Sequence, residues 1–313
     1  MTCILKSVQE QATITRNMYI FREVSEMKNI LCIELRKSLK NRLFILSVIM
    51  GFAVSFLSFL YNYELYTTAS EETRLYSNEF GIIYNPMLSM NTLYNSWVGG
   101  EAFTLGTTVF FFIIPILTAI PYGWSYCSEL KSGYIKNVVT RCGKMQYFIS
   151  KYIATFISGG LAVAIPLICN FILTASFIPA YQPQVRYMQY YGIFSNTFLS
   201  EVFYRNPVIY ILIYIFIDFI FCGLIACLSC TSANIIKNKV VAMLTPFGVL
   251  LLFNYIADII KSSRNIEASP MNFLRPCPVA CPVTLWVIIT EMIILFIITV
   301  IPMIIRGRCY EFY

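Results

Sequence analysis

The chain has 313 residues, of which 58% are apolar and 12% charged, with a formal net charge of +7 and no histidine. A soluble globular domain carries about a quarter charged residues, so this composition excludes a chain whose surface lies mostly in water. The absence of histidine removes the usual metal ligand and the usual general base at neutral pH. The basic residues stand in short clusters beside apolar runs, which favours membrane orientation signals over nucleic acid binding.

Residues 1–26 differ in composition from the stretch that follows them. The sequence that opens at Met27 reads like a natural start. We therefore expect 1–26 to form a loosely held extension and 27–313 to form a single transmembrane domain. No cleavable signal peptide is expected, because the first 42 residues are polar and the first apolar run begins at Leu43.

Six apolar runs predict an all-α integral membrane protein, because a helix needs roughly 20 apolar residues to cross a bilayer. We place the six spans at 43–61, 103–124, 152–178, 207–231, 240–260 and 284–305. Prolines inside these runs, which are expected to kink the helices without breaking them, are Pro115, Pro121, Pro166, Pro246 and Pro302. Small residues of the third span predict close approach of a second helix, with packing inside the chain favoured and a dimer seam left open; they are Ser158, Gly159, Gly160 and Ala164.

Lysine and arginine are distributed unequally between alternate connecting segments, with 17 of 23 on one side. The excess of positive charge marks the cytoplasmic side, so both termini are expected in the cytoplasm. The three outer segments are then 62–102, which is acidic, 179–206, which is rich in aromatic residues, and 261–283. The aromatic residues indicate an interfacial belt, with contact to an amphipathic cargo or partner left open. Cys277 and Cys281 share the third segment, and their spacing does not decide whether they form a disulfide.

The inner segment after the second span carries a helical pattern of apolar residues. If this segment is helical from Glu129 to Val139, its apolar positions recur every three or four residues. Such a helix would lie along the inner face of the membrane. An ordinary basic loop that sets topology is the alternative. The apolar positions are Leu130, Tyr134, Ile135, Val138 and Val139.

The order of residues in this segment resembles the cytoplasmic loop of the type 2 ABC transporter permeases. In that family an acidic residue, a turn of small residues, an amphipathic coupling helix, a basic residue and a lysine entering the next span follow one another. The matching positions are Glu129, Gly133, Arg141, Lys144 and Lys151, with Tyr134 where the family often has threonine. A second stretch, residues 33–44, resembles the basic amphipathic helix that leads into the family's first span.

The resemblance covers roughly residues 27–305 and assigns roles to two groups of residues. It implies that ATPase coupling involves Glu129, Gly133, Tyr134, Lys136, Arg141 and Lys144. It implies that the N-terminal amphipathic helix uses Glu34, Arg36, Lys37 and Arg42. Both sets lie on the predicted cytoplasmic side.

The function implied by the resemblance is that of a membrane subunit of an ATP-driven exporter in the cell membrane. Such a subunit pairs with a second permease copy or homologue and with ABC ATPase subunits on separate chains. The chain lacks a G-x-x-x-x-G-K-[ST] phosphate-binding loop, so we expect no enzymatic activity, cofactor or metal of its own. The expected cargo is a peptide or a hydrophobic compound, and membrane lipid is the other expected partner.

Three acidic residues fall within predicted spans: Asp258, near the outer end of the fifth, is expected at the membrane interface, whereas Asp218 in the fourth and Glu291 in the sixth lie deeper. A charge at membrane depth costs at least about 2.5–3.5 kcal/mol, so both are expected to face the helix bundle or a cavity. Cargo contact, proton coupling and simple packing remain open for them. Two rival functions follow: an ion-coupled secondary transporter, and a non-transporting sensor or scaffold whose outer segment recognises a ligand. The absence of an internal repeat argues against the first rival.

Overall fold

The computed structural model describes residues 27–85, 90–101, 103–195, 197–264, 266–277, 281 and 283–309. The predicted N-terminal extension, residues 1–26, lies outside these ranges. Within them the chain forms helices and turns and no strand. The all-helical class predicted from the sequence is therefore confirmed for the described part of the chain.

The helices begin with one over residues 27–39. The labelled helices that follow are α2 (Arg42–Phe80), α3 (Leu93–Ser96), α4 (Leu105–Ala119), α5 (Ser125–Ser132), α6 (Tyr134–Val139), α7 (Lys144–Phe177), α8 (Met188–Tyr191), α9 (Ser200–Arg205), α10 (Pro207–Ser232), α11 (Lys239–Arg264), α12 (Pro270–Phe273) and α13 (Leu285–Cys309). A 3₁₀ turn over Val185–Tyr187 precedes α8.

Five of these helices, α2, α7, α10, α11 and α13, are long and apolar enough to cross a membrane. The chain is therefore a multi-pass membrane protein. Helix α4 has 15 residues, which gives about 22 Å at 1.5 Å per residue, less than the roughly 30 Å of a bilayer core. It ends two residues before Pro121, which has no N–H to donate to the Leu117 oxygen and so interrupts the helical hydrogen-bond ladder. The prediction of unbroken helix over 103–124 with a mere kink at Pro121 is wrong.

Proline does behave as predicted elsewhere in the bundle. Pro115, Pro166, Pro246 and Pro302 all lie inside continuous helices. A proline inside a helix removes one backbone hydrogen bond, and groups on neighbouring helices can compensate for this loss. The helices therefore continue through these four prolines without ending there.

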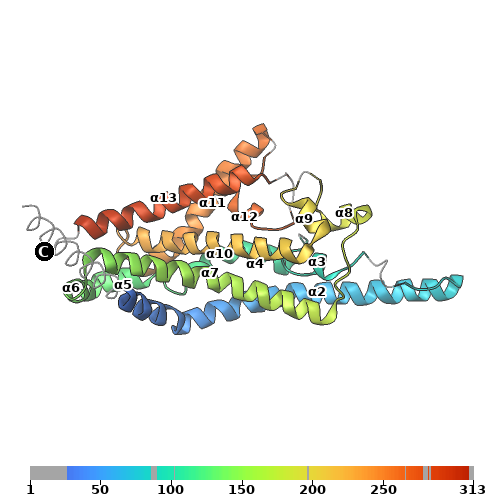
Figure 1. Cartoon of the computed structure of the whole chain (residues 1–313), viewed down its shortest axis with the longest axis horizontal. Helices are drawn as coiled ribbons and strands as arrows, with labels where there is room; N and C mark the ends of the chain where they lie inside the picture. The colour runs from blue at the N-terminus through green and yellow to red at the C-terminus, as the bar shows by residue number, and fades with distance from the viewer. Residues whose placement is uncertain are drawn as a thin grey trace, which may run out of the picture.

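Helix α2 is longer than the predicted first span and projects beyond the rest of the bundle (Figure 1). Its 39 residues correspond to about 58 Å, roughly twice a bilayer core. Gly81 ends the helix with a left-handed φ of 64°, and its N–H donates to the Ser77 oxygen. The first part of the acidic segment 62–102 is therefore helical, in continuation of the span.

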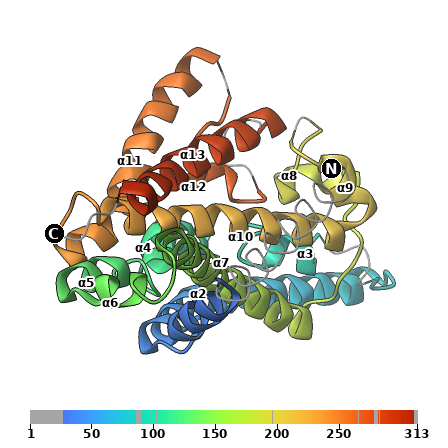
Figure 2. The ribbon, with the colours of Figure 1, turned by 60° about the vertical axis from the view of Figure 1, so that its left-hand side comes forward.

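Helix α10 occupies the middle of the bundle, with α2 on one side and α11 and α13 on the other (Figures 1 and 2). Its most extensive packing is with α7. Small residues make this approach possible, because a Cβ at Gly159 would lie 2.2 Å from the Cβ of Ala226, and one at Gly160 would lie 2.6 Å from the Phe219 oxygen. The small residues of the third span thus serve packing within the chain, as predicted.

The aromatic segment 179–206 packs into the core more than it forms an interfacial belt. Tyr191 and Phe203 are each 1% exposed, with ring centroids 5.9 Å apart. The thiol of Cys277 donates to the Tyr191 oxygen at 3.4 Å and closes the same cluster. Cys277 and Cys281 are not joined by a disulfide. Tyr190, among others, remains exposed, so the predicted belt is only partly realised.

Candidate functional site, a buried network around Lys151

The helix over residues 27–39 presents one charged residue, Glu34, to the protein interior. Its buried positions are Ile30, Glu34 and Ser38, spaced four apart and therefore on one face. Asn41 then forms the corner into α2: its side-chain oxygen accepts from the Leu43 N–H at 3.1 Å, and its amide donates to the Pro121 oxygen at 3.1 Å. The corner is thereby tied to the turn between α4 and α5, which fixes the position of Glu34.

The inner segment predicted as one helix is two short helices joined at Gly133. Gly133 has φ 70° and ψ 6°, and a left-handed residue ends a helix because the hydrogen-bond ladder cannot continue through it. The prediction of continuous helix from Glu129 to Val139 is therefore wrong. The apolar face of α6 packs on protein rather than lying along the bilayer, with Ile135 buried among Tyr147 and Phe148 of α7.

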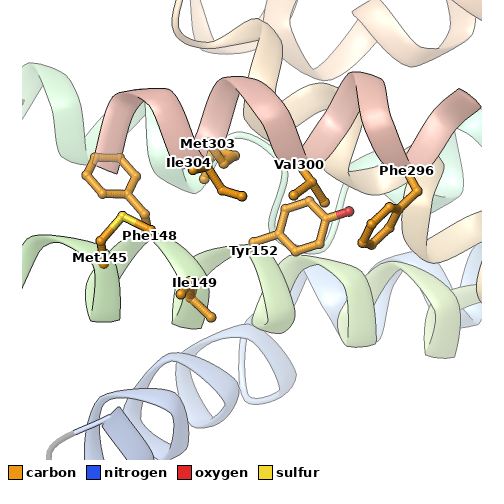
Figure 3. Close-up of a pocket in the computed structure, with 8 residues that line it drawn as sticks. All are labelled: Met145, Phe148, Ile149, Tyr152, Phe296, Val300, Met303 and Ile304. Carbon is orange, nitrogen blue, oxygen red and sulfur yellow. The ribbon is translucent and has the colours of Figure 1, made fainter. Parts of the chain in front are cut away.

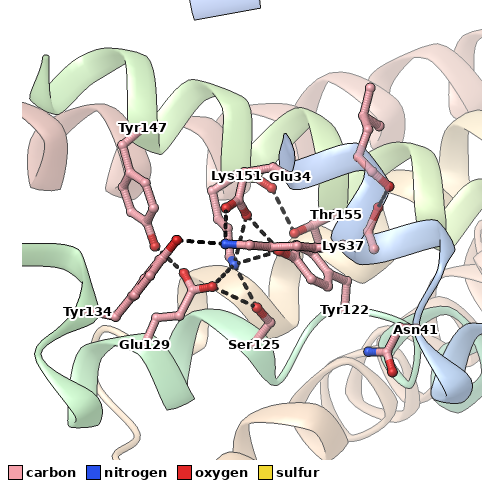
Figure 4. A network of polar contacts seen from close by, with 12 residues as sticks. Glu34, Lys37, Asn41, Tyr122, Ser125, Glu129, Tyr134, Tyr147, Lys151 and Thr155 are labelled. Atoms are coloured by element: carbon pink, nitrogen blue, oxygen red, sulfur yellow. Dashed lines mark hydrogen bonds and ion pairs between the residues drawn. The ribbon is translucent and has the colours of Figure 1, made fainter. Parts of the chain in front are cut away.

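Lys151 lies at the centre of a buried polar network (Figure 4). It sits about two turns inside α7. Its ammonium reaches Glu34 Oε2 at 3.1 Å and Glu129 Oε1 at 2.8 Å. It also donates to Ser125 Oγ at 2.6 Å and to Tyr122 Oη at 3.0 Å. The side chain of Lys151 is 0% exposed, so its charge is neutralised entirely by these groups.

The remaining oxygens of the two carboxylates are satisfied by a second layer of donors. Tyr122 Oη donates to Glu34 Oε2 at 2.6 Å, and Tyr147 Oη donates to Glu129 Oε2. Lys37 Nζ lies 3.0 Å from Glu34 Oε1. Two lysines thus face two glutamates, and every carboxylate oxygen has a partner, which is the condition for a buried ion pair to persist.

The electrostatics of the N-terminal helix favour ionised groups. Burial raises the pKa of Glu34. Lys151, the Tyr122 hydroxyl and Lys37 lower it by more than burial raises it, so the pKa of Glu34 lies below its ordinary value. Burial lowers the pKa of Lys37, but its hydrogen bond to the Tyr134 hydroxyl and the Glu34 charge raise it above the ordinary value. Both groups are charged at neutral pH, so the network consists of ion pairs and not of shared protons.

The predicted site residues divide into network members and surface residues. Glu34, Lys37, Glu129 and Tyr134 join the network, the last through a hydrogen bond of 2.9 Å from Lys37. Gly133 is the joint between α5 and α6. The other residues of the two groups assigned by the resemblance are exposed or half-exposed on the surface at the same end of the bundle: Arg36, Arg42, Lys136, Arg141 and Lys144.

Sequence reasoning missed three members of the network. They are Tyr122, Ser125 and Tyr147. Tyr147 carried a usable signal, since it stands four residues before Lys151 and therefore on the same helix face. Ser125 stands four residues before Glu129 in the same way. Tyr122 carried none, because it lies in a turn and reaches Glu34 only through the tertiary fold.

The two intramembrane acids lie apart from this network. Asp218 of α10 is 1% exposed, and neither of its carboxylate oxygens has a hydrogen-bond partner in the described residues. Glu291 of α13 has one buried oxygen in the same condition. The structure therefore joins Asp218 neither to Glu291 nor to Lys151. An unpartnered acid at membrane depth is costly and is a functional candidate for that reason.

Two hollows border the network where the helix 27–39 faces α5 and α6. One of about 370 Å³ lies against Lys37, Tyr122 and Glu129. The other, of about 500 Å³, lies on the far side of Tyr134, against Glu34 and Arg141. The helix 27–39 is therefore joined to α5 and α6 through the network, and a hollow separates them on each side of it.

A third hollow, of about 240 Å³, lies between α7 and α13 near the same end of the bundle (Figure 3). Its walls are apolar and include Met145, Phe148 and Met303. Tyr152 points into it and its hydroxyl is 2.9 Å from the Thr299 hydroxyl. With no charged group in its lining, this hollow can accept only an apolar group, such as part of a lipid chain.

No protein-family model, no curated protein and no solved structure matches the chain. Function is therefore inferred from the network, from the helices around it and from the resemblance of the two inner segments to the type 2 permeases.

Proposed function

We propose that the chain is the membrane subunit of an ATP-driven exporter of the type 2 ABC permease class, which moves a peptide or a hydrophobic compound across the cell membrane. The observation that carries this proposal is the Lys151 network. It connects the helix 27–39 and α5, both at one end of the bundle, to α7, a helix long and apolar enough to cross the membrane. Force applied to α5 and α6 is thereby transmitted to α7.

The exposed side of α6 and the turn after it supply the docking surface for the ATPase subunits. Lys136 and Arg141 are exposed there, while the opposite side of α6 is buried against α7. Closure of the ATPases on ATP would push α5 and α6 as a unit. Because α7 packs most extensively on α10, this push would shift the α7–α10 pair between an inward-closed and an outward-open arrangement.

Contacts at the network end support six crossings with both termini on one side, and the excess of lysine and arginine on that side favours the cytoplasm. Glu34 and Glu129 share one lysine, so the helix 27–39 and α5 lie at the same end, and α4 must return the chain that α2 carried across. The Tyr126 hydroxyl donates to Asn234 at 2.9 Å, which places the α10–α11 connection at this end. Arg306 lies 3.4 Å from the same Asn234 oxygen, which adds the end of α13.

Partners within the membrane follow from the exposed apolar faces. Helices α2, α11 and α13 are the least enclosed of the candidate spans. Their exposed leucines, isoleucines and phenylalanines must contact either lipid tails or another apolar chain. A second permease copy or homologue and membrane lipid are therefore the proposed neighbours.

The test replaces one exposed arginine with glutamate and measures the ATPase that accompanies the chain. The tagged chain is purified from its native membrane, and ATP hydrolysis in the eluate is assayed. Arg141→Glu should reduce this activity by about tenfold or more, since reversing a charge at a docking surface costs several kcal/mol. Arg74→Glu, at the exposed far end of α2, is the matched control and should leave it unchanged. Absence of any ATPase with the wild-type chain would overturn the proposal.

A second candidate function is favoured by Asp218. A buried acid whose oxygens both lack partners is suited to take up and release a proton, as in an ion-coupled secondary transporter. This alternative predicts that liposomes containing only the purified chain take up the transported compound when a proton gradient is applied. Uptake should then be lost in Asp218→Asn. The exporter reading instead predicts no transport without the ATPase.

A further inference from the structure

A crevice of about 350 Å³ lies at the end of the bundle remote from Lys151, between α4 and α11. Val109, Phe112 and Leu251 form its apolar walls, and Asn254, Asn272 and Arg275 form its polar end. The crevice therefore combines a hydrocarbon-like groove with a cationic head, an arrangement suited to an amphiphile that carries a negative charge.

The guanidinium of Arg275 is incompletely satisfied by the protein. Its Nε is buried and has no hydrogen-bond partner among the described residues. Burial lowers the pKa of Arg275, although Glu101 and Cys277 act in the opposite direction. Its nearest aromatic contact is the Phe111 ring, with the centroid 5.4 Å from the guanidinium carbon. An unpaired donor of this kind is costly unless a ligand accepts from it.

The acidic groups near the crevice are already engaged elsewhere. Glu101 accepts from Ser58 at 3.0 Å and from the Phe103 and Thr104 backbone N–H groups at 2.8 Å. Glu267 is paired with Lys261 at 2.9 Å. Neither carboxylate provides the partner that Arg275 Nε lacks. An anion entering the crevice would therefore meet the half-buried guanidinium of Arg275.

The groove opens sideways, toward the surroundings of the bundle. Phe112 is 47% and Leu251 40% exposed, so the walls form part of the outer surface. At its inner end Phe112 meets Phe247 edge to face, with ring centroids 5.3 Å apart. An occupant would enter from the bilayer between α4 and α11, with its charged group at the end of the helices and its chain directed along them.

We propose that this crevice binds an anionic phospholipid of the surrounding bilayer, with the phosphate against Arg275 and an acyl chain between α4 and α11. The lipid fills the gap between the short helix α4 and α11, and its phosphate offsets the cost of the half-buried charge of Arg275. This inference depends on the chain lying in a membrane and not on the proposed coupling to ATP.

The experiment measures phospholipid that stays bound when the full chain is transferred from detergent into the gas phase for native mass spectrometry. Phosphatidylglycerol and phosphatidylcholine are added separately at equal concentration. Wild-type chain should retain phosphatidylglycerol in preference to phosphatidylcholine. Arg275→Gln should reduce this retention by about tenfold, as expected when one charge-assisted hydrogen bond is lost. Arg205→Gln, at an exposed arginine of α9, is the matched control and should retain as much as wild type.

A second variant tests the groove without touching the arginine. Val109→Trp narrows the crevice while keeping Arg275, and it should reduce retention of phosphatidylglycerol as well. Inorganic phosphate at millimolar concentration should not displace the lipid, because it lacks a chain. Equal retention by wild type and both variants, equal retention of the two lipids, or displacement by phosphate alone would each overturn the proposal.

Discussion

Lys151 is a buried charge whose stability depends on every member of its surroundings. The cost of removing its ammonium from water is offset by two carboxylates and two hydroxyl groups. Because a second lysine, Lys37, balances the second carboxylate, the cluster has no net charge. Loss of one cation would leave a buried carboxylate uncompensated, which costs far more than an exposed ion pair contributes.

Replacement of Lys151 by methionine should therefore lower the free energy of unfolding by about 3–5 kcal/mol. The measurement is thermal unfolding of the detergent-solubilised chain. Lys131→Met, at an exposed lysine of α5, is the control and should change the stability by less than about 0.5 kcal/mol. An unchanged unfolding temperature in Lys151→Met would show that the network does not hold the three elements together.

The sequence contained part of this site. Glu34, Glu129 and Lys151 could be singled out from their order along the chain and their resemblance to a family pattern. Their mutual contact could not, because 117 residues separate Glu34 from Lys151 and nothing local indicates which charges will meet. Tyr122 was undetectable for a stronger reason: a tyrosine in a turn is unremarkable until the fold brings its hydroxyl to a carboxylate.

Helices α5 and α6 show what periodicity can predict and what it cannot. The apolar spacing identified part of the buried face, since Ile135 and Val139 are buried, whereas Tyr134 is exposed. It did not identify what covers that face, because burial by protein and burial by lipid select the same residues. The apolar spacing also did not predict the break at Gly133, because a hydrophobic pattern does not depend on the sign of the φ angle.

There is room for a side chain at position 133, but the backbone conformation of Gly133 is unfavourable for any other residue. A Cβ there would meet nothing within 4 Å, yet the φ of 70° is unfavourable for other residues. We expect Gly133→Ala to destabilise the chain by about 1–2 kcal/mol. Gly248 of α11 also has open space around it, and Gly248→Ala should stabilise by up to about 1 kcal/mol because alanine favours helix. Thermal unfolding of both variants distinguishes the two, and a shift of both in the same direction would contradict a conformational role for Gly133.

The whole molecule poses the question of how many times the chain crosses the membrane. Hydropathy predicted six runs of comparable length, whereas the structure has five long helices and one short one. The difference arises at the second run, where the apolar residues continue past the point at which Pro121 ends the helix. In the proposed arrangement of six crossings, the short helix α4 and the turn at 120–124 return the chain to the network end.

Cysteine labelling decides between five and six crossings. Single cysteines are placed at three exposed positions: Glu71 on the extension of α2, Lys136 on α6 and Gln189 on α8. With six crossings and cytoplasmic termini, a membrane-impermeant maleimide should label positions 71 and 189 in intact cells, and position 136 only after permeabilisation. The reason is that α4 separates the first from the second position and α7 separates the second from the third.

Background labelling comes from native thiols, of which Cys32, Cys169 and Cys309 are exposed in the part of the chain that the structure describes. The parent chain has these three and Cys3 replaced by serine. Restoring Cys32 or Cys309 provides a native reporter for each end of the chain, and both should behave like position 136. Labelling of 71 and 136 from the same side would mean that α4 does not cross. The Glu34–Lys151–Glu129 contact could not then form within a membrane-embedded chain, because its members would be held on opposite sides of the bilayer.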